Sequence, residues 1–452
     1  MTNILQRFVQ KNPLTGDALK ILTHYRHFKK MYKFLKESYT WSEEQIREYQ
    51  TQQLRKLLHH AYKNVPYYAK LFDKLKLKPK DISSVEDLQK LPLLDKQTVR
   101  ENLEEFKAKN FPKRKFEYIT TGGSTGFPLG LYVERGVAEA IHMAFLQILL
   151  DQVDCHFTDR QVHIIGIEEA CKYQVFGRIL ILSSFHMKDE NMPTFIRKIR
   201  RLKPKFILGF PSAVTILARY MNKNKIEPFP SVKTVICSGE TLYDWQRELL
   251  EETFKCRVHA VYSHNEVSVF ATTCAYSNDY HVYPEYGIAE LIRKDGKPVT
   301  KEGEMGEIVV TGFNNPLFPL IRYRTGDIGV LAHQKCKCGR NYLLLKRIEG
   351  RVQDFIVSKS GRYIPLTGFY GLVAKCSNNV RNCQLVQEVE GEVILNIVKD
   401  KGYTDEDENS IVRAFEKRFG GEVDLIIRYV DQIPLTSGGK FKFLIQKLPI
   451  DY

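Results

Sequence analysis

The sequence predicts an α/β fold, with a large N-terminal domain of mostly parallel sheets, helices and a smaller β-rich part, and a small, mobile α+β C-terminal domain. Three observations predict it. Short apolar runs alternate with helical segments from residue 162 to residue 254, the pattern of strand–helix units with parallel strands. Two β-rich runs, 287–292 and 306–313, then follow closely and indicate an antiparallel part. After Arg351 the order changes to strand, strand, helix, strand.

The first 110 residues are predicted to be helical. Residues 42–45 read SEEQ, a capping box, and the apolar residues that follow it have helical spacing. The basic and aromatic run 24–36 fits two structures. It is either a solvated helix face with extended lysines or a helix that lies on an anionic membrane surface.

The central region supplies the expected parallel sheet. Strands are predicted at 162–167, 206–210 and 232–239, and helices at 211–221 and 242–254. Ligands of such sheets bind where the strands end. The residues that follow these strands are therefore candidates for a binding site.

The last hundred residues form the expected small domain. Predicted strands at 383–389 and 392–398 flank a turn at Glu390 and Gly391, an acidic segment opens a helix that runs to Phe419, and a strand follows at 423–430. We expect one domain over residues 1–351 and a second over residues 352–452.

Composition narrows the class of protein. The chain has 452 residues, 43% of them hydrophobic and 27% charged, with 68 basic against 53 acidic residues and a formal net charge of +15. This charge favours anionic ligands, and because no nucleic-acid-binding motif is found, no nucleic-acid partner is expected. No apolar run reaches 18 residues, so we expect a cytoplasmic protein, with peripheral membrane contact through the basic run left open. Nine cysteines in so long a chain favour thiols or metal ligands over a disulfide scaffold.

A loop rich in glycine and hydroxyl groups, YITTGGSTGFPL at residues 118–129, favours phosphate binding. Glycines let backbone N–H groups turn toward an anion, and hydroxyl groups add further donors. A Walker loop requires lysine after its last glycine, whereas Phe127 follows Gly126 here. The alternative is an ordinary surface turn.

Further signals stand in a fixed order along the chain. Gly239 and Glu240 follow a strand in CSGETL, and Tyr262 and Glu266 stand in YSHNE. Asp327 ends RYRTGD, Arg351 ends EGR, and Lys440 follows two glycines in PLTSGGKFK. Each alone is typical of an ordinary turn. Their order is what indicates a function.

This order resembles the adenylate-forming superfamily of acyl- and aryl-CoA synthetases, and within it the phenylacetate-CoA ligase-like group that includes the CapK proteins of capsular polysaccharide gene clusters. The resemblance covers nearly the whole chain and implies an ATP-binding, Mg²⁺-dependent ligase. It implies that Tyr262 stacks near adenine, Glu266 holds Mg²⁺, Asp327 binds the ribose and Lys440 is the catalytic lysine. The other ATP-binding residues that it implies are Thr120, Thr121, Gly122, Gly123, Ser124, Thr125, Gly126, Gly239, Glu240 and Arg351.

The sequence departs from the family pattern at two places. The family's aromatic-Gly-x-Thr-Glu pattern reads Tyr-Ser-His-Asn-Glu here, so Ser263 and His264 become candidate residues of the substrate pocket. The hinge position two residues after Arg351 is Gln353, with Asp354 next to it, and either is a candidate pivot.

The implied reaction activates a carboxylic acid as an acyl-adenylate, releases pyrophosphate, and passes the acyl group to coenzyme A or to an amine, in the setting of polysaccharide biosynthesis. Cations and N–H donors must neutralise the charge that grows when a carboxylate attacks a phosphate. The alternative is a non-catalytic nucleotide- or membrane-associated scaffold with the same fold. Retention of Glu266, Asp327 and Lys440 favours the enzyme. Substrate identity and oligomeric state are not readable from the sequence.

Four residues match the ligand set of a closed structural zinc site. Cys274 and His281 stand in one segment, and Cys336 and Cys338 in another. Three thiolates and one imidazole suit tetrahedral Zn²⁺. The spacing is not that of a standard zinc finger, and the alternative is four unrelated residues.

Overall fold

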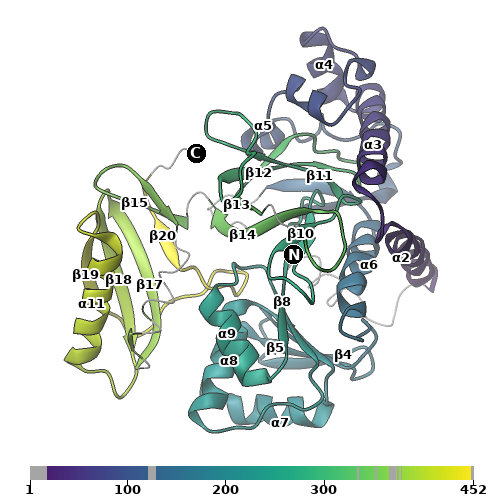
Figure 1. The fold of residues 1–452 in the computed structure, drawn as a ribbon. Helices are drawn as coiled ribbons and strands as arrows, with labels where there is room; N and C mark the ends of the chain where they lie inside the picture. The colour runs from purple at the N-terminus through teal and green to yellow at the C-terminus, as the bar shows by residue number, and fades with distance from the viewer. Residues whose placement is uncertain are drawn as a thin grey trace. The chain divides into compact units, whose positions relative to one another are not determined.

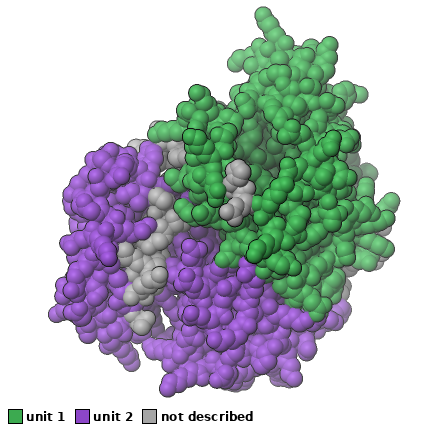
Figure 2. All heavy atoms as spheres, viewed as in Figure 1, with its two compact units in different colours: residues 1–159, 259–347 green, residues 160–258, 348–452 purple. Residues whose placement is uncertain are grey.

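The computed structural model describes residues 18–120, 129–332, 335–351, 354–365, 373, 376, 377 and 379–448 (Figure 1). The chain forms two compact units (Figure 2). Unit 1 contains residues 1–159 and 259–347, and unit 2 contains residues 160–258 and 348–452. The domain boundary expected near residue 352 stays a prediction.

Unit 1 begins with helices, as predicted. They are α2 (Ala18–Ser38), α3 (Glu43–Asn64), α4 (Pro66–Lys74), α5 (Lys96–Glu101) and α6 (Val137–Asp151), with 3₁₀ turns at Pro79–Asp81, Glu86–Lys90 and Lys113–Lys115. The predicted capping box starts α3: the Gln45 N–H donates to Ser42 Oγ at 3.2 Å, and the Ser42 N–H donates to Gln45 Oε1 at 2.9 Å. The buried side of α3 carries the predicted apolar residues, among them Leu54 and Leu58.

Helix α2 carries the basic and aromatic run. It packs against α6, burying Phe28 and Leu35, and Tyr32 Oη donates to Asp151 Oδ2 at 2.7 Å. Its lysines at 29, 30, 33 and 36 are exposed. One face of α2 is therefore packed and the lysine face is solvated, as expected for a solvated helix with extended lysines. Contact of this helix with a membrane stays a prediction. Across the part of the chain that the structure describes, no helix combines the length and apolarity needed to cross a membrane.

The strands of unit 1 are mainly antiparallel. A hairpin joins β1 (Phe116–Thr120) to β2 (Gly130–Glu134). The larger sheet has the order β11-β12-β13-β14-β10-β9-β8. Its strands are β8 (Arg257–Ser263), β9 (Phe270–Thr272), β10 (Tyr280–Val282), β11 (Gly287–Ile292), β12 (Met305–Gly312), β13 (Tyr323–Ala332) and β14 (Leu343–Arg351). The antiparallel pairing of β11 with β12 confirms the prediction for these two runs.

Unit 2 contains the predicted parallel sheet. Its strand order is β7-β6-β3-β5-β4, and only β4 runs antiparallel to its neighbour. The strands are β3 (Gln161–Ile165), β4 (Cys171–Gln174), β5 (Ile179–Ser183), β6 (Phe206–Gly209) and β7 (Thr234–Ser238), and the helices are α7 (Met192–Leu202), α8 (Pro211–Lys223), α9 (Asp244–Phe254) and a 3₁₀ turn at Ser184–His186. Strands β3, β5, β6 and β7 are buried along their whole length, which explains why apolar residues predominate in their sequences.

The C-terminal residues of unit 2 have the predicted strand, strand, helix, strand order. The elements are β17 (Val380–Val389), β18 (Glu392–Lys399), α11 (Asp405–Phe419), β19 (Asp424–Tyr429) and β20 (Leu444–Gln446), preceded by the hairpin β15 (Phe355–Val357) and β16 (Tyr363–Pro365). The sheet order is β19-β18-β17-β20. This sheet and α11 enclose a hydrophobic core, which includes Leu385, Leu395, Ile411 and Phe415.

Candidate active site and metal centre

The ends of the glycine-rich loop are held together in unit 1. Thr120 ends β1 and pairs with Gly130, the first residue of β2. The Asn265 side-chain amide donates to the Thr120 carbonyl at 3.3 Å, so this loop end is joined to the segment that carries Glu266. Of the predicted phosphate-binding residues, Thr121, Gly122, Gly123, Ser124, Thr125 and Gly126 lie outside the described part of the chain.

The end of β8 places Tyr262 next to Asp327. Tyr262 Oη donates to Asp327 Oδ2 at 2.8 Å, although the two residues are 65 positions apart in the sequence. Burial, and then the charge of Asp327, raise the pKa of Tyr262 well above its usual value, so the phenol stays protonated. Gly326, with a φ of +75°, lies next to Asp327 within β13, where the pairing with β12 is irregular. The residues expected at adenine and ribose are thus brought together.

Glu266 is a buried carboxylate with two partners. It is 5% exposed, and Tyr323 Oη donates to its Oε1 at 3.2 Å while His264 Nδ1 lies 3.2 Å from its Oε2. Burial alone would raise the pKa of Glu266, but the charge and hydrogen bond of His264, with the charge of Lys96, outweigh burial and hold the pKa below its usual range. An ionised carboxylate is the kind of oxygen ligand that Mg²⁺ prefers.

The candidate pocket residues beside Glu266, Ser263 and His264, are partly buried. Ser263 pairs with Phe270 across β8 and β9, and its Oγ has no hydrogen-bond partner within the described part of the chain. His264 contacts Glu266, as above. A substrate-binding role for Ser263 and His264 stays a prediction.

In unit 2, Glu240 joins the start of α8 to the segment around Lys440. Its carboxylate accepts hydrogen bonds from the Ser212 N–H and Oγ, both at 3.0 Å, and from the Phe441 N–H at 2.8 Å. Gly239 precedes it with a φ of +83°. Burial raises the pKa of Glu240, and the hydrogen bonds from Ser212 and Phe441 oppose that effect. Contact of Gly239 and Glu240 with adenine stays a prediction.

Lys440 lies on a tight turn. The Gly439 N–H donates to the Thr436 carbonyl at 2.8 Å, and the Thr436 N–H donates to the Lys440 carbonyl at 2.9 Å. The Lys440 ammonium lies 5.8 Å from the centre of the Phe210 ring, at the start of α8. The turn therefore fixes the backbone of the lysine.

The candidate hinge follows β14. The Arg351 N–H donates to Asp354 Oδ2 at 2.8 Å, while Gln353 lies outside the described part of the chain. Gly350 has a φ of +102°, and a Cβ there would lie 2.7 Å from Asp354 Oδ2. Asp354 thus contacts the end of β14, and the pivot role of Gln353 or Asp354, like the contact of Arg351 with ATP, stays a prediction.

The four predicted zinc ligands meet in unit 1. Their donor atoms all lie within 4.8 Å of one another. Cys274 Sγ is 3.5 Å from Cys336 Sγ, and Cys338 Sγ is 3.3 Å from His281 Nε2. Four donors at such distances surround one position, which is the arrangement of a tetrahedral metal site.

Neighbouring groups orient these ligands, which we call the Cys/His cluster. His281 Nδ1 lies 3.1 Å from the Asp279 carbonyl, so its Nε2 faces the sulfurs. Arg340 Nε donates to Cys338 Sγ at 3.5 Å. The guanidinium of Arg340 is buried at 2% exposure and lies 5.2, 5.7 and 5.4 Å from the ring centres of Tyr39, Tyr283 and Tyr342. A buried cation beside Cys338 favours the thiolate form of that residue.

Sequence reasoning missed Tyr323 and Arg340. Both stand inside segments that were singled out: Tyr323 in RYRTGD and Arg340 directly after Cys338 and Gly339. The only sequence signal for a role of these two residues was their position within or directly after a predicted motif. Their partners, Glu266 and the tyrosine rings, are distant in the sequence and gave none.

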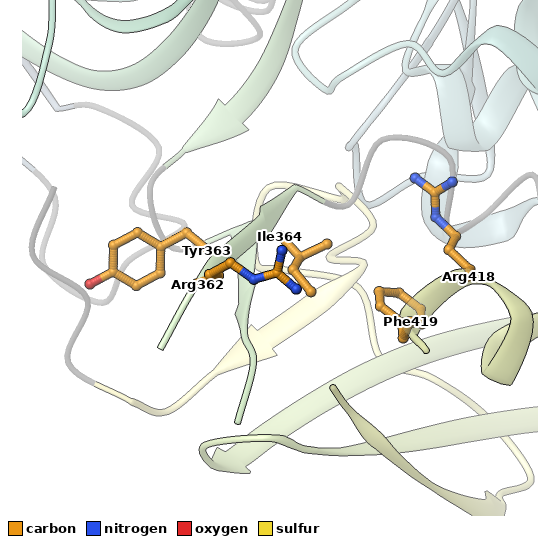
Figure 3. A pocket seen from close by; sticks show the side chains of 5 residues that line it. All are labelled: Arg362, Tyr363, Ile364, Arg418 and Phe419. Atoms are coloured by element: carbon orange, nitrogen blue, oxygen red, sulfur yellow. The ribbon is translucent and has the colours of Figure 1, made fainter. Parts of the chain in front are cut away.

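A surface hollow of about 360 Å³ lies among the C-terminal residues (Figure 3). Arg362, Tyr363, Ile364, Arg418 and Phe419 line it, and it contains none of the predicted site residues. Arg362 lies 3.6 Å from Glu422 and donates to Ser360 Oγ, so its charge already has partners. We do not assign the active site to this hollow.

Comparison with known families gives two matches. A model of the AMP-binding enzyme family matches residues 49–315, more than half of the chain. A model of the CapK C-terminal domain matches residues 356–447.

Individual proteins match along most of their length. The chain is 26% identical over 415 residues to Protein CapK of Staphylococcus aureus, covering 89% of each chain. It is 21% identical over 438 residues to a phenylacetate-coenzyme A ligase of Thermus thermophilus, covering 89% of this chain and 97% of the other. A crystal structure of 2-hydroxyisobutyryl-CoA ligase in the postadenylation state is similar in fold, with a TM-score of 0.73 and 17% identity over 90% of this chain and 91% of that one.

Proposed function

The chain belongs to the AMP-binding enzyme family, in the group that resembles CapK and the phenylacetate-CoA ligases, and on this premise we propose how its residues divide the reaction. It activates a carboxylic acid with ATP as an acyl-adenylate, releases pyrophosphate, and transfers the acyl group to the thiol of coenzyme A. The sequence resemblance supports a place in polysaccharide biosynthesis. Cytoplasmic location stays an expectation.

The observation that carries this proposal is the meeting of Tyr262, Asp327 and Glu266 in unit 1. The Tyr262 hydroxyl donates to Asp327, so the residue proposed to stack near adenine and the residue proposed to bind the ribose lie side by side. Glu266 is held ionised by its buried partners. Mg²⁺ bound by Glu266 would neutralise charge on the phosphates during attack by the substrate carboxylate.

Lys440 supplies the second cationic group. The substrate carboxylate and the α-phosphate are both anionic, so a positioned ammonium stabilises the charge that develops as pyrophosphate leaves. The acyl-adenylate reacts readily with water, which favours a site that is complete only when the substrates are bound.

Exchange of labelled pyrophosphate into ATP tests the proposal. We expect exchange that depends on an added acid, within a panel of aryl, fatty, amino and hydroxy acids. Glu266→Gln should reduce it strongly because the metal ligand loses its charge, while Glu302→Gln, at an exposed position of the same unit, should not. A folded wild-type protein that is inert across the panel would favour the scaffold. Coenzyme A and amine acceptors are distinguished by mass spectrometry of the acylated product.

We also propose that the Cys/His cluster binds one structural Zn²⁺. Three thiolates and one neutral imidazole around Zn²⁺ carry a net charge of −1, and the buried Arg340 beside Cys338 supplies the balancing positive charge. With four protein ligands no position is open for substrate, so the ion holds segments together and takes no part in the chemistry.

A further inference from the structure

The residues on both sides of Lys440 are held by hydrogen bonds within unit 2. We call residues 436–441 the lysine loop. The Ser184 hydroxyl donates to the carbonyl of Gly439 at 2.7 Å, and the N–H of Phe441 donates to Glu240 at 2.8 Å. Ser184 is buried, and Glu240 is itself fixed by its two hydrogen bonds from Ser212. The backbone that carries Lys440 is therefore fixed on either side.

A contact between glycines brings the lysine loop close to the end of β3. A Cβ at Gly166 would lie 2.3 Å from the carbonyl oxygen of Gly438 and 3.0 Å from the Cα of Gly439. A Cβ at Gly439 would lie 2.4 Å from Ser184 Oγ and 2.6 Å from the Cα of Gly166. Neither position has room for a side chain while the loop is seated.

Gly166 differs from Gly439 in one respect. Gly439 has a φ of +74° and needs glycine for its own backbone, whereas Gly166 is not among the positive-φ glycines. The three atoms nearest to a Cβ at Gly166 all belong to the lysine loop. An alanine at position 166 would therefore disturb the seating of the loop without straining the sheet that carries it.

Further contacts between the described C-terminal residues and residues 160–258 involve residues outside the lysine loop. Two are exposed ion pairs, Lys223 with Asp400 at 2.9 Å and Arg381 with Asp189 at 3.2 Å, which water and salt weaken. The rings of Tyr243 and Phe443 pack at 5.2 Å, two residues beyond Phe441. These contacts hold the C-terminal residues in place but do not set the loop.

We propose that Gly166, Ser184 and Glu240 form a seat for the lysine loop and act as positioning residues for Lys440 during adenylation. The proposal rests on the proposed function. An ammonium stabilises a transition state only when it is already in place, and a displacement of about 1 Å can cost about 100-fold in rate. Acyl transfer from a finished adenylate no longer loses pyrophosphate, so it does not need the seated lysine.

Separate measurement of the two half reactions tests the seat. The acid with the highest wild-type pyrophosphate exchange is used, together with its chemically synthesised adenylate and coenzyme A. Gly166→Ala should lower exchange about 100-fold, because the loop is displaced. Ser184→Ala should lower it about 10-fold, as expected for one lost hydrogen bond, and Glu240→Ala by at least as much, because its bonds from Ser212 and Phe441 are all lost. Thioester formation from the supplied adenylate should stay within about threefold of wild type, since that step makes no use of the seated charge.

Two controls separate positioning from a loss of structure. Glu240→Gln keeps an acceptor oxygen for the Phe441 N–H and should retain most of the exchange that Glu240→Ala loses. Lys223→Gln removes an exposed ion pair between the same two regions and should leave exchange unchanged. Unfolding curves of all variants are compared with wild type.

The outcomes distinguish this proposal from the one on which it rests. Absence of exchange in the wild type contradicts the proposed function. A wild type that exchanges, with Gly166→Ala equally active, overturns the seat alone. Equal loss of both half reactions in a normally folded Gly166→Ala also overturns it, because the seat would then not be specific to adenylation.

Discussion

The Cys/His cluster of unit 1 and the lysine loop of unit 2 are both short turns with a positive-φ glycine, Gly339 in one and Gly439 in the other, yet they are held in different ways. In the cluster the contacts are made by side chains, some fully and some partly buried: three sulfurs, an imidazole and the guanidinium of Arg340. In the lysine loop they are made by backbone groups and by glycines that touch.

The difference separates a permanent attachment from a reversible one. Release of the cluster would expose Arg340 and leave buried sulfurs without partners, which is costly. Release of the loop exchanges two hydrogen bonds for bonds to water, and each such bond contributes only about 0.5–1.5 kcal/mol net. The proposed function, in which Lys440 leaves its place after adenylation, requires the second kind of contact.

The largest expected effect removes the group that the loop carries. Lys440→Ala should lower adenylation, measured by pyrophosphate exchange, by about 10²- to 10³-fold, because a charge contact made mainly in the transition state is lost. Transfer from a supplied adenylate should change much less. Lys447→Ala, at an exposed lysine paired with Glu388, is the control. Equal loss in both half reactions would mean that Lys440 is structural and that the loop is not reversible.

The next largest effect is expected at the Cys/His cluster, which we propose to bind zinc. Purified protein should contain about one zinc per chain, and Cys336→Ser should lower both zinc content and the midpoint of thermal unfolding, since metal binding contributes to folding. Cys171→Ser, outside the cluster, should change neither. Protein purified without chelator that holds no metal, or a fully stable and metal-replete Cys336→Ser variant, would refute the zinc site.

Arg340→Gln tests the charge balance at the same cluster. Loss of the buried cation should weaken zinc binding by about 10- to 100-fold, the range seen when groups that support metal ligands are removed. Competition with a chromophoric chelator measures this without an activity assay. An unchanged affinity would show that Arg340 only packs against its tyrosines.

The lowered pKa of Glu266 predicts how acid changes the stability of the protein. A carboxyl group whose pKa is lower in the folded state than in the unfolded state stabilises the protein above the unfolded value and loses that contribution as the pH falls through the folded value. Glu266→Gln should therefore lose less stability than wild type on acidification below about pH 4.3, the ordinary glutamate pKa. Parallel unfolding curves for the two proteins at every pH would contradict the ionised state of Glu266.

The smallest effect is expected at the exposed ion pair of Lys223 with Asp400. Lys223→Ala should change the free energy of unfolding by less than about 1 kcal/mol, because both side chains are partly solvated. Denaturant unfolding measures it. A larger loss would mean that the C-terminal residues depend on surface charge more than on the apolar contact of Tyr243 with Phe443.

The sequence predicted what depends on neighbours along the chain. Ser42 and Gln45 start α3 as predicted, and the continuous apolar runs became buried parallel strands, because capping and strand formation are read from local pattern. It also predicted the four residues of the Cys/His cluster from their chemistry.

It did not predict the partners that the fold supplies. Glu240 was expected beside adenine, and its bond to Phe441, 201 residues away, has no local signal. Gly166 looked like the end of a strand, since nothing in VHIIGI shows that Gly438 will lie against it. The role of Tyr323 could not be predicted for the same reason, because its hydrogen bond to Glu266 joins two segments that are distant in the sequence.

The β1–β2 hairpin has a consequence for the entropy of nucleotide binding. Thr120 pairs with Gly130, so the strands close the nine intervening residues, 121–129, before any ligand arrives. Bringing together the ends of a flexible segment of this length costs about 2 kcal/mol of chain entropy, from the logarithmic dependence on loop length. In this protein that cost falls on folding, through the strand pairing and the Asn265 bond to Thr120. A ligand that binds between these two ends therefore does not have to bring them together.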